Sequence, residues 1–191
     1  MARLIDRDFT RGSPGACLVF VSLATDDISA NTLLMLAHAI CKELGRRVLL
    51  VDARFGNQSL GISGRFGLTE HLGFSDAVQG LAKLEDLIRP TTVANVDVLP
   101  AGDASDWFAP VDRQKLKDVF DAARARYDFV LVQVGAPDND TRAVLTAAEG
   151  DAAFLLALEN HTYMRILDNC RKVLVDNGVK DLRVVLTNGR A

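Results

Sequence analysis

Residues Cys17–Gly45 read CLVFVSLATDDISANTLLMLAHAICKELG and carry the clearest signal of the fold class. Its first part, Cys17–Ser22, is a short apolar run of the kind that forms strands buried on both faces of a sheet. Its last part has apolar residues at helical spacing, and Gly45 is a typical C-terminal stop for a helix. The apolar stripe consists of Leu33, Leu36, Ala37, Ile40 and Leu44. The stretch therefore predicts a buried strand followed by a crossover helix, Ala30–Leu44.

The alternation of strand and helix continues along the chain. Further apolar segments rich in Val, Leu and Phe are Arg47–Asp52, Val96–Leu99, Phe129–Val134, Ala153–Leu158 and Leu182–Leu186. Helical spacing between them is clearest in Pro110–Arg126 and Thr162–Asp176. This pattern predicts an α/β fold: a doubly wound, mainly parallel sheet of about six or seven strands with helices on both faces and Cys17–Ser22 at its centre. Ligands in such folds bind beyond the carboxyl ends of the strands, and the glycine-rich segment Gly56–Gly73 is expected to be a loop over that crevice.

Length and composition set the class of protein. The chain has 191 residues, 49% of them hydrophobic and 25% charged, which fits one globular domain over residues 1–191 and excludes disordered and coiled-coil classes. A formal net charge of −3 gives no overall attraction to nucleic acid. The longest apolar run, Ala152–Leu158, is far too short to cross a bilayer, and the N-terminus has no apolar secretion core. We therefore expect a cytoplasmic protein without nucleic-acid partner or direct membrane insertion.

The cysteines and histidines do not have the spacing of a metal site. The chain has three cysteines, Cys17, Cys41 and Cys170, which lie far apart and form no CxxC pair. His38, His71 and His161 are equally scattered. We expect neither a zinc site nor a disulfide framework.

The residues after the first strand, Leu23–Thr32, occupy the place of a phosphate-binding loop. Such a loop uses glycines to curl its N–H groups around an anion, a lysine to reach the outer phosphates and a hydroxyl to hold magnesium. This segment contains no glycine and no lysine. Asp26 and Asp27 would instead oppose the phosphates, each contact at ~4 Å costing about 1 kcal/mol in water and about 4 kcal/mol at a protein surface. Ile28 is β-branched and resists the positive φ angles that phosphate nests often use.

Several phrases, in order, indicate a family. They are LGRRVLLVDAR (Leu44–Arg54), the whole of Gly73–Gly102, RYDFVLVQVGAP (Arg126–Pro137) and VVLTNG (Val184–Gly189). With them the chain resembles, over nearly its whole length, the partitioning and septum-site ATPase superfamily of P-loop proteins. It is most similar to the bacterial tyrosine autokinases that accompany exopolysaccharide co-polymerases. The resemblance implies a P-loop NTPase-like fold.

The departures from the family pattern fall on the nucleotide chemistry. The resemblance places Asp26 and Ile28 at two glycine positions, Ser29 at the lysine and Ala30 at the magnesium-holding hydroxyl. The second-strand acid is kept as Asp52. Gln133 stands at the acid of the Walker B strand, and Asn188 stands where the family borders the base. The resemblance thus implies a vestigial site at Asp26, Asp27, Ile28, Ser29, Ala30, Asp52, Gln133 and Asn188. We expect no catalytic residue, cofactor or metal there.

The acidic residues near the strand ends have more than one interpretation. Asp26 and Asp27 are typical of a helix N-terminus, where they cap the helix and favour its dipole. A second interpretation is an acidic crevice, neutralised by arginines in place of nucleotide and metal, and a third is direct binding of a divalent cation. The residues of that crevice would be Asp26, Asp27, Asp52, Asp138 and Asp140, with Arg54 and Arg142 as the neutralising arginines.

Two hypotheses about function follow. The first is a non-catalytic pseudokinase or pseudo-ATPase that acts as a scaffold or regulator in exopolysaccharide biosynthesis and export. The second is an atypical ATPase or tyrosine-kinase-like enzyme whose site is rearranged or completed by a partner. The autokinases also carry a tyrosine-rich tail and an N-terminal, ring-forming helix with spaced Glu and Arg. We expect neither feature in this chain. Its only tyrosines, Tyr127 and Tyr163, fall in predicted secondary structure and not in a tail.

The resemblance also implies partners. They are the cytoplasmic segment of a membrane polysaccharide co-polymerase, which would recruit the chain to the inner face of the membrane, or an active homologue, and a homodimer is left open. The adjacent aromatics Trp107 and Phe108 lie in a polar loop. They either fold back on the following helix or serve as a docking anchor.

Overall fold

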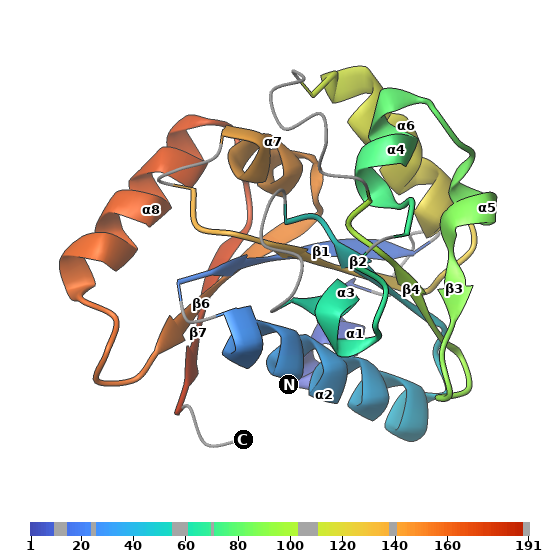
Figure 1. Ribbon diagram of the computed structural model, residues 1–191. Coiled ribbons are helices and arrows are strands. Elements are labelled where there is room, and N and C mark those ends of the chain that lie inside the picture. The colour runs from blue at the N-terminus through green and yellow to red at the C-terminus, as the bar shows by residue number, and fades with distance from the viewer. Residues whose placement is uncertain are drawn as a thin grey trace.

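The computed structural model describes residues 1–9, 15–23, 26–54, 61–69, 71–102, 111–137 and 141–188, without the side chains of Asp26 and Asp27. They form a seven-stranded sheet in the order β3-β4-β2-β5-β1-β6-β7 (Figure 1). The strands are β1 (Ala16–Ser22), β2 (Val48–Asp52), β3 (Arg89–Pro90), β4 (Val96–Leu99), β5 (Phe129–Val134), β6 (Ala152–Leu158) and β7 (Leu182–Thr187). All neighbours pair in parallel except β3 with β4, which confirms the predicted mainly parallel sheet.

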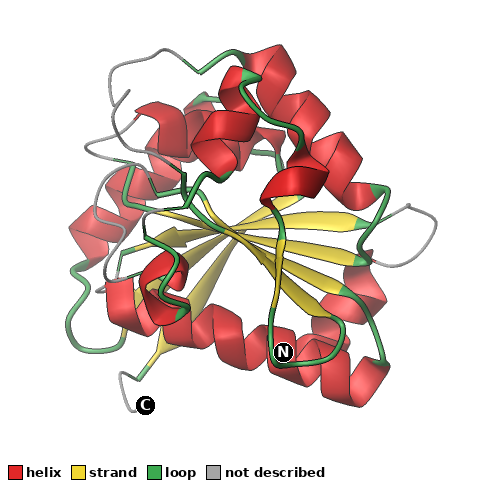
Figure 2. Ribbon diagram, turned by 45° about the vertical axis from the view of Figure 1, so that its right-hand side comes forward, coloured by secondary structure: helices red, strands yellow, loops and turns green. Residues whose placement is uncertain are grey.

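Helices cover both faces of this sheet (Figure 2). One face carries α1 (Ala2–Phe9), α2 (Asp26–Leu44) and α3 (Ile62–Arg65). The other carries α4 (Phe74–Gln79), α5 (Leu84–Leu87), α6 (Arg113–Arg124), α7 (Thr141–Glu149) and α8 (Met164–Asp176). Strands β1 and β5 are buried at every residue because they lie between these two layers. No helix in the described ranges combines the length and apolar character needed for a membrane crossing.

Several elements differ from the sequence prediction. The middle strand is β5, with β1 beside it. Helix α2 begins at Asp26, four residues before the predicted start at Ala30. The prediction missed this first turn because it is mostly polar and shows no apolar periodicity. The expected loop Gly56–Gly73 contains the helix α3, which at a single turn is too short to give a periodic signal.

The helix α1 was not predicted either, because its eight residues are too few for a clear pattern. Its Ile5 is fully buried under the sheet. Ion pairs hold its polar face: Arg3 with Glu43 at 3.4 Å, Arg46 with Asp6 at 3.1 Å and Arg183 with Asp8 at 2.7 Å. The hydrogen bond from Arg183 also lowers the pKa of the Asp8 carboxyl. Helix α1 is thereby fixed to α2 and to β7.

Candidate functional site

The candidate site lies where β1, β2 and β5 end. Parallel strands place their carboxyl ends on one edge of the sheet, and the register pairs Asp52 of β2 with Gln133 of β5. Ser29 lies in the first turns of α2, which follows β1. All three side chains are fully buried. The fold therefore brings together the three residues that the sequence resemblance assigns to the lysine, the second-strand acid and the Walker B acid.

The carboxylate of Asp52 is fully engaged by the chain itself. Its Oδ2 accepts hydrogen bonds from the backbone N–H and the hydroxyl of Ser63, at 2.9 and 2.8 Å. Its Oδ1 accepts from the backbone N–H and the Nε of Arg54, both at 3.2 Å. A carboxylate offers about four acceptor positions. The protein's own donors thus take the positions that a metal-bound water would need.

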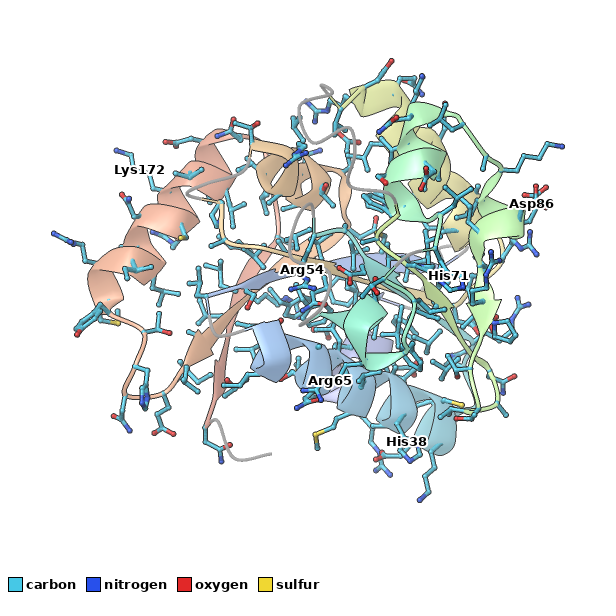
Figure 3. The ribbon with its side chains drawn as sticks, in the orientation of Figure 1. His38, Arg54, Arg65, His71, Asp86 and Lys172 are labelled. Atoms are coloured by element: carbon cyan, nitrogen blue, oxygen red, sulfur yellow. The ribbon has the colours of Figure 1, made fainter. Side chains whose placement is uncertain are left out.

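Arg54 supplies the countercharge for Asp52 from within the protein. The two side chains form a buried ion pair at 3.2 Å, and Figure 3 shows Arg54 in the interior, beside α3 and near the start of α2. The guanidinium packs closely against Gly61. A Cβ atom at that position would come within 1.7 Å of Nη2 of Arg54. The absence of a side chain at Gly61 is what lets the arginine reach the strand ends.

Gln133 connects Ser29 to the segment of α3. Its Nε2 donates to Oγ of Ser29, and its Oε1 accepts from the backbone N–H of Ile62 at 3.1 Å. Ser63 extends the same set of contacts, because its Oγ accepts from the backbone N–H of Ala101 at 3.0 Å. Helix α3 is therefore hydrogen-bonded to the ends of β2 and β5 and to Ala101, which lies two residues after β4.

We call Ser29, Asp52, Arg54, Ile62, Ser63 and Gln133 the strand-end network. Its hydrogen bonds link two strand residues, Asp52 and Gln133, to Arg54 just after β2, to Ser29 near the start of α2 and to α3. Buried polar groups are costly unless they are paired, so this network stabilises a closed arrangement of the site. Within the described ranges, no group of three or more His, Cys, Asp or Glu side chains is arranged to hold a metal ion.

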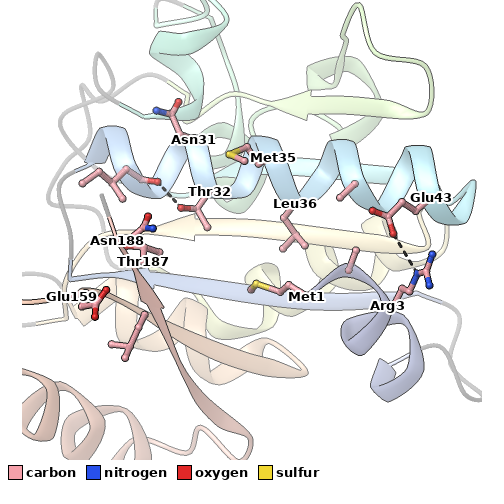
Figure 4. A pocket seen from close by; sticks show the side chains of 14 residues that line it. Met1, Arg3, Asn31, Thr32, Met35, Leu36, Glu43, Glu159, Thr187 and Asn188 are labelled. Atoms are coloured by element: carbon pink, nitrogen blue, oxygen red, sulfur yellow. Dashed lines mark hydrogen bonds and ion pairs between the residues drawn. The ribbon is translucent and has the colours of Figure 1, made fainter. Parts of the chain in front are cut away.

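Other predicted positions lie apart from this network. Ala30 lies in α2 and its side chain is buried in the core. Ile28 and Asn188 line an open groove of about 680 Å³ between α1, α2 and the end of β7 (Figure 4). The backbone at Asp26, where the family pattern has a glycine, is already helical. Residues 26–28 thus belong to a helix in this chain.

Some predictions lie outside the described residues. These are the docking candidates Trp107 and Phe108, the acidic residues Asp138 and Asp140, and the side chains of Asp26 and Asp27. Of the proposed acidic crevice with internal arginines, the structure describes Asp52, Arg54 and Arg142. The Asp52–Arg54 ion pair forms, and Arg142 lies in the first turn of α7.

Gly61, Ile62 and Ser63 are site residues that the sequence did not predict. Their segment has neither strand nor helix periodicity, and Ile62 contributes a backbone N–H that no side-chain pattern reveals. The glycine itself was visible, but its packing against Arg54 is a tertiary contact. No signal in the sequence pointed to these three residues.

Comparison with known proteins bears on the fold. No protein-family model matches the chain, and no curated protein sequence matches it. Among solved structures, the chain is similar to the kinase domain of VpsO, with a TM-score of 0.80 and 19% identity over 99% of this chain and 91% of that one. The kinase domain of the Escherichia coli tyrosine kinase ETK gives a TM-score of 0.79 and 16% identity, covering 99% of this chain and 75% of that one.

ATPases of the same architecture are also similar. The septum-site-determining protein MinD from Pyrococcus horikoshii, in complex with Mg-ADP, matches with a TM-score of 0.70 and 25% identity over 93% of this chain and 72% of that one. The seven-stranded, mainly parallel sheet is thus the fold of the ParA and MinD class of P-loop ATPases. The chain is also structurally similar to bacterial tyrosine kinase domains.

Proposed function

We propose that the chain is a non-catalytic pseudokinase or pseudo-ATPase. The observation that carries this proposal is the strand-end network, in which Asp52 accepts from Arg54 and Ser63 while Gln133 connects Ser29 to Ile62. A phosphoryl-transfer site needs a lysine, a magnesium ligand and a water-anchoring acid that are open to the ligand. Here a buried serine and a glutamine stand at the lysine and Walker B positions, and the retained acid is neutralised internally.

The charge at the site supports the same conclusion. The one described carboxylate of the network faces a guanidinium at 3.2 Å, so a magnesium ion would have to displace Arg54 to reach Asp52. The displaced arginine would then lie buried without its partner, which is strongly unfavourable. Binding of Mg-nucleotide would therefore have to break the network.

Titration with Mg-ATP and Mg-ADP tests the absence of a nucleotide site. We expect no binding heat and no rise in the melting temperature at about 1 mM nucleotide, because a ligand that binds only the folded state must stabilise it by mass action. Titration of nucleotide in EDTA supplies the matched baseline. Saturable heat that requires magnesium would overturn the proposal and favour an atypical ATPase or kinase with a rearranged site.

We further propose that the chain acts as a scaffold or regulator in exopolysaccharide biosynthesis and export. The structural similarity to the VpsO and ETK kinase domains supports this assignment. A fold without catalytic residues acts through its surface. We propose a cytoplasmic protein that is recruited to the membrane by a co-polymerase's cytoplasmic segment, or that pairs with an active homologue, with Trp107 and Phe108 as the anchor.

A pull-down with the co-polymerase's cytoplasmic segment tests the anchor. The double variant Trp107→Ala/Phe108→Ala is expected to bind at least about thirtyfold more weakly than the wild type, since loss of a buried aromatic anchor typically costs 2 kcal/mol or more. The variant Leu81→Ala, an exposed apolar residue between α4 and α5, serves as the control for simple loss of apolar surface. Equal binding by a folded double variant would remove these two aromatics from the proposal.

A further inference from the structure

The two edges of the sheet are built differently. At one edge β3 has two residues, Arg89 and Pro90, and proline cannot donate a ladder hydrogen bond. At the other edge β7 has six residues, from Leu182 to Thr187, and contains no proline. Among the described residues β7 pairs with β6 alone. Natural sheets usually shorten, charge or cover such edges, because an open strand is a template for pairing with another chain.

The outward main-chain groups of β7 can be assigned from its pairing. The carbonyls of Asp181 and Thr187 accept hydrogen bonds from Ala153 and Glu159, so these odd-numbered positions direct their polar groups toward β6. In a parallel pair successive residues alternate in direction. The outward N–H and C=O groups are therefore those of Leu182, Val184 and Leu186.

The side chains of this edge are apolar and partly exposed. Val184 is 46% exposed and Leu186 is 68% exposed. The charged side chain within β7, Arg183, is held by Asp8 at 2.7 Å and Asp181 at 2.8 Å, and it lies over the ring of Phe9. The guanidinium of Arg183 is thus paired with carboxylates of this chain, and the three residues whose main-chain groups point outward are uncharged.

Exposed apolar side chains also lie near the end of the strand. Leu186 borders the groove between α1 and α2, where Met1 is 52% exposed and Met35 is 71% exposed (Figure 4). Single exposed apolar residues are ordinary, but an apolar stretch beside an open strand marks a surface suited to another protein.

We propose that β7 pairs antiparallel with β7 of a second copy of this chain, around a two-fold axis at Val184. In this register Val184 lies opposite Val184 of the second copy, and Leu182 lies opposite Leu186. Each of the three outward residues exchanges main-chain hydrogen bonds with its counterpart. The result is one sheet that runs continuously through both copies.

The edge of β7 is complementary to itself, which favours a second copy of this chain as its partner. All cross-strand pairs on the face of Val184 are apolar, which is favourable in a sheet. The same register places Arg183 opposite Val185 of the second copy, whereas a two-fold axis at Arg183 would place two guanidinium groups face to face. A two-fold interface must use one patch for both partners, and β7 meets that requirement with its own sequence. This inference does not depend on the proposed function.

Sedimentation velocity with an edge variant tests the pairing. We expect the wild-type chain to dimerise reversibly at about 100 μM, since a small interface gives affinities in the micromolar range. Val184→Pro removes the outward N–H at the two-fold axis, and edge strands tolerate proline at such positions. It is expected to weaken dimerisation about tenfold or more, whereas Val184→Thr, which keeps the N–H and the β-branch, is expected to dimerise like the wild type. Circular dichroism checks that each variant folds.

Disulfide formation reports the register directly. In a Cys41→Ser background, Val184→Cys is expected to form a crosslinked dimer, because hydrogen-bonded antiparallel pairs have Cα atoms about 5.5 Å apart, within disulfide range. Leu186→Cys is the matched control. In the proposed register its two copies lie about 13 Å apart and cannot be bridged. A monomeric wild type, a dimer that survives Val184→Pro, or equal crosslinking at both positions would overturn the proposal.

Discussion

Replacing Arg54 by methionine is expected to lower the free energy of unfolding by about 3–5 kcal/mol, because the substitution leaves the buried carboxylate of Asp52 without its cation. Methionine keeps much of the apolar volume of arginine, so the loss reports the charge more than a cavity. The hydrogen bonds from Ser63 to Asp52 remain, but neutral donors do not replace a positive charge at 3.2 Å.

Urea unfolding followed by circular dichroism measures this loss. Arg171→Met, on the exposed side of α8, is the matched control and is expected to change stability by less than about 0.5 kcal/mol. Adding Asp52→Asn to Arg54→Met is expected to recover about 2 kcal/mol, since a neutral amide needs no counterion. Gly61→Val should also destabilise the fold, because its Cβ displaces the guanidinium. A loss below about 1 kcal/mol for Arg54→Met would contradict the prediction, because the Asp52–Arg54 ion pair would then contribute no more stability than a salt bridge at the surface.

The sequence predicted those parts of the fold whose burial is uniform. Cys17–Ser22 and Phe129–Val134 read as strands because both of their faces are covered, so every position had to be apolar. The start of α2 was missed because its first turn is polar. The strand β3 consists of two residues and exists only through its pairing with β4, which no local pattern encodes.

The candidate site was predictable to the same extent. Ser29 directly precedes a predicted helix, Asp52 ends a predicted strand and Gln133 is the next-to-last residue of another. Parallel topology alone places such residues at one edge of the sheet. Their hydrogen-bond partners were not predictable, because Ser63 and Gly61 reach the site through tertiary packing of α3. The sequence resemblance therefore implied that the nucleotide-binding groups are replaced, while the structure adds the hydrogen bonds that Ser29, Asp52 and Gln133 form with their neighbours.

Replacing Gln133 by glutamate is expected to destabilise the protein by about 3 kcal/mol at pH 7 and by less than about 1 kcal/mol at pH 4. The side chain is fully buried and its residue pairs with Asp52 on the neighbouring strand, so the variant places two carboxylates side by side in the interior. Burial and the like charge both raise the pKa of the new carboxyl above its value in the unfolded chain, about 4.3. Below that value the glutamic acid is protonated in both states, and its O–H and C=O can replace the amide toward Ser29 and Ile62. As the pH rises from about 4.3 toward the folded-state pKa, the unfolded state has released its proton while the folded state still holds it, so the variant loses stability over this range.

Urea unfolding of the Gln133→Glu variant between pH 4 and pH 8 checks this prediction. Gln133→Met is the matched control, because it removes the same hydrogen bonds without adding a charge, and its loss of stability is expected to change little with pH. Gln114→Glu, on the exposed face of α6, controls for the added carboxylate itself. An acid at the Walker B position supplies neither the glycine nest nor the lysine, so titration of Gln133→Glu with Mg-ATP is expected to give no heat. Equal destabilisation at pH 4 and pH 7, or nucleotide binding by this single variant, would show that the strand-end network is more open than its hydrogen bonds imply.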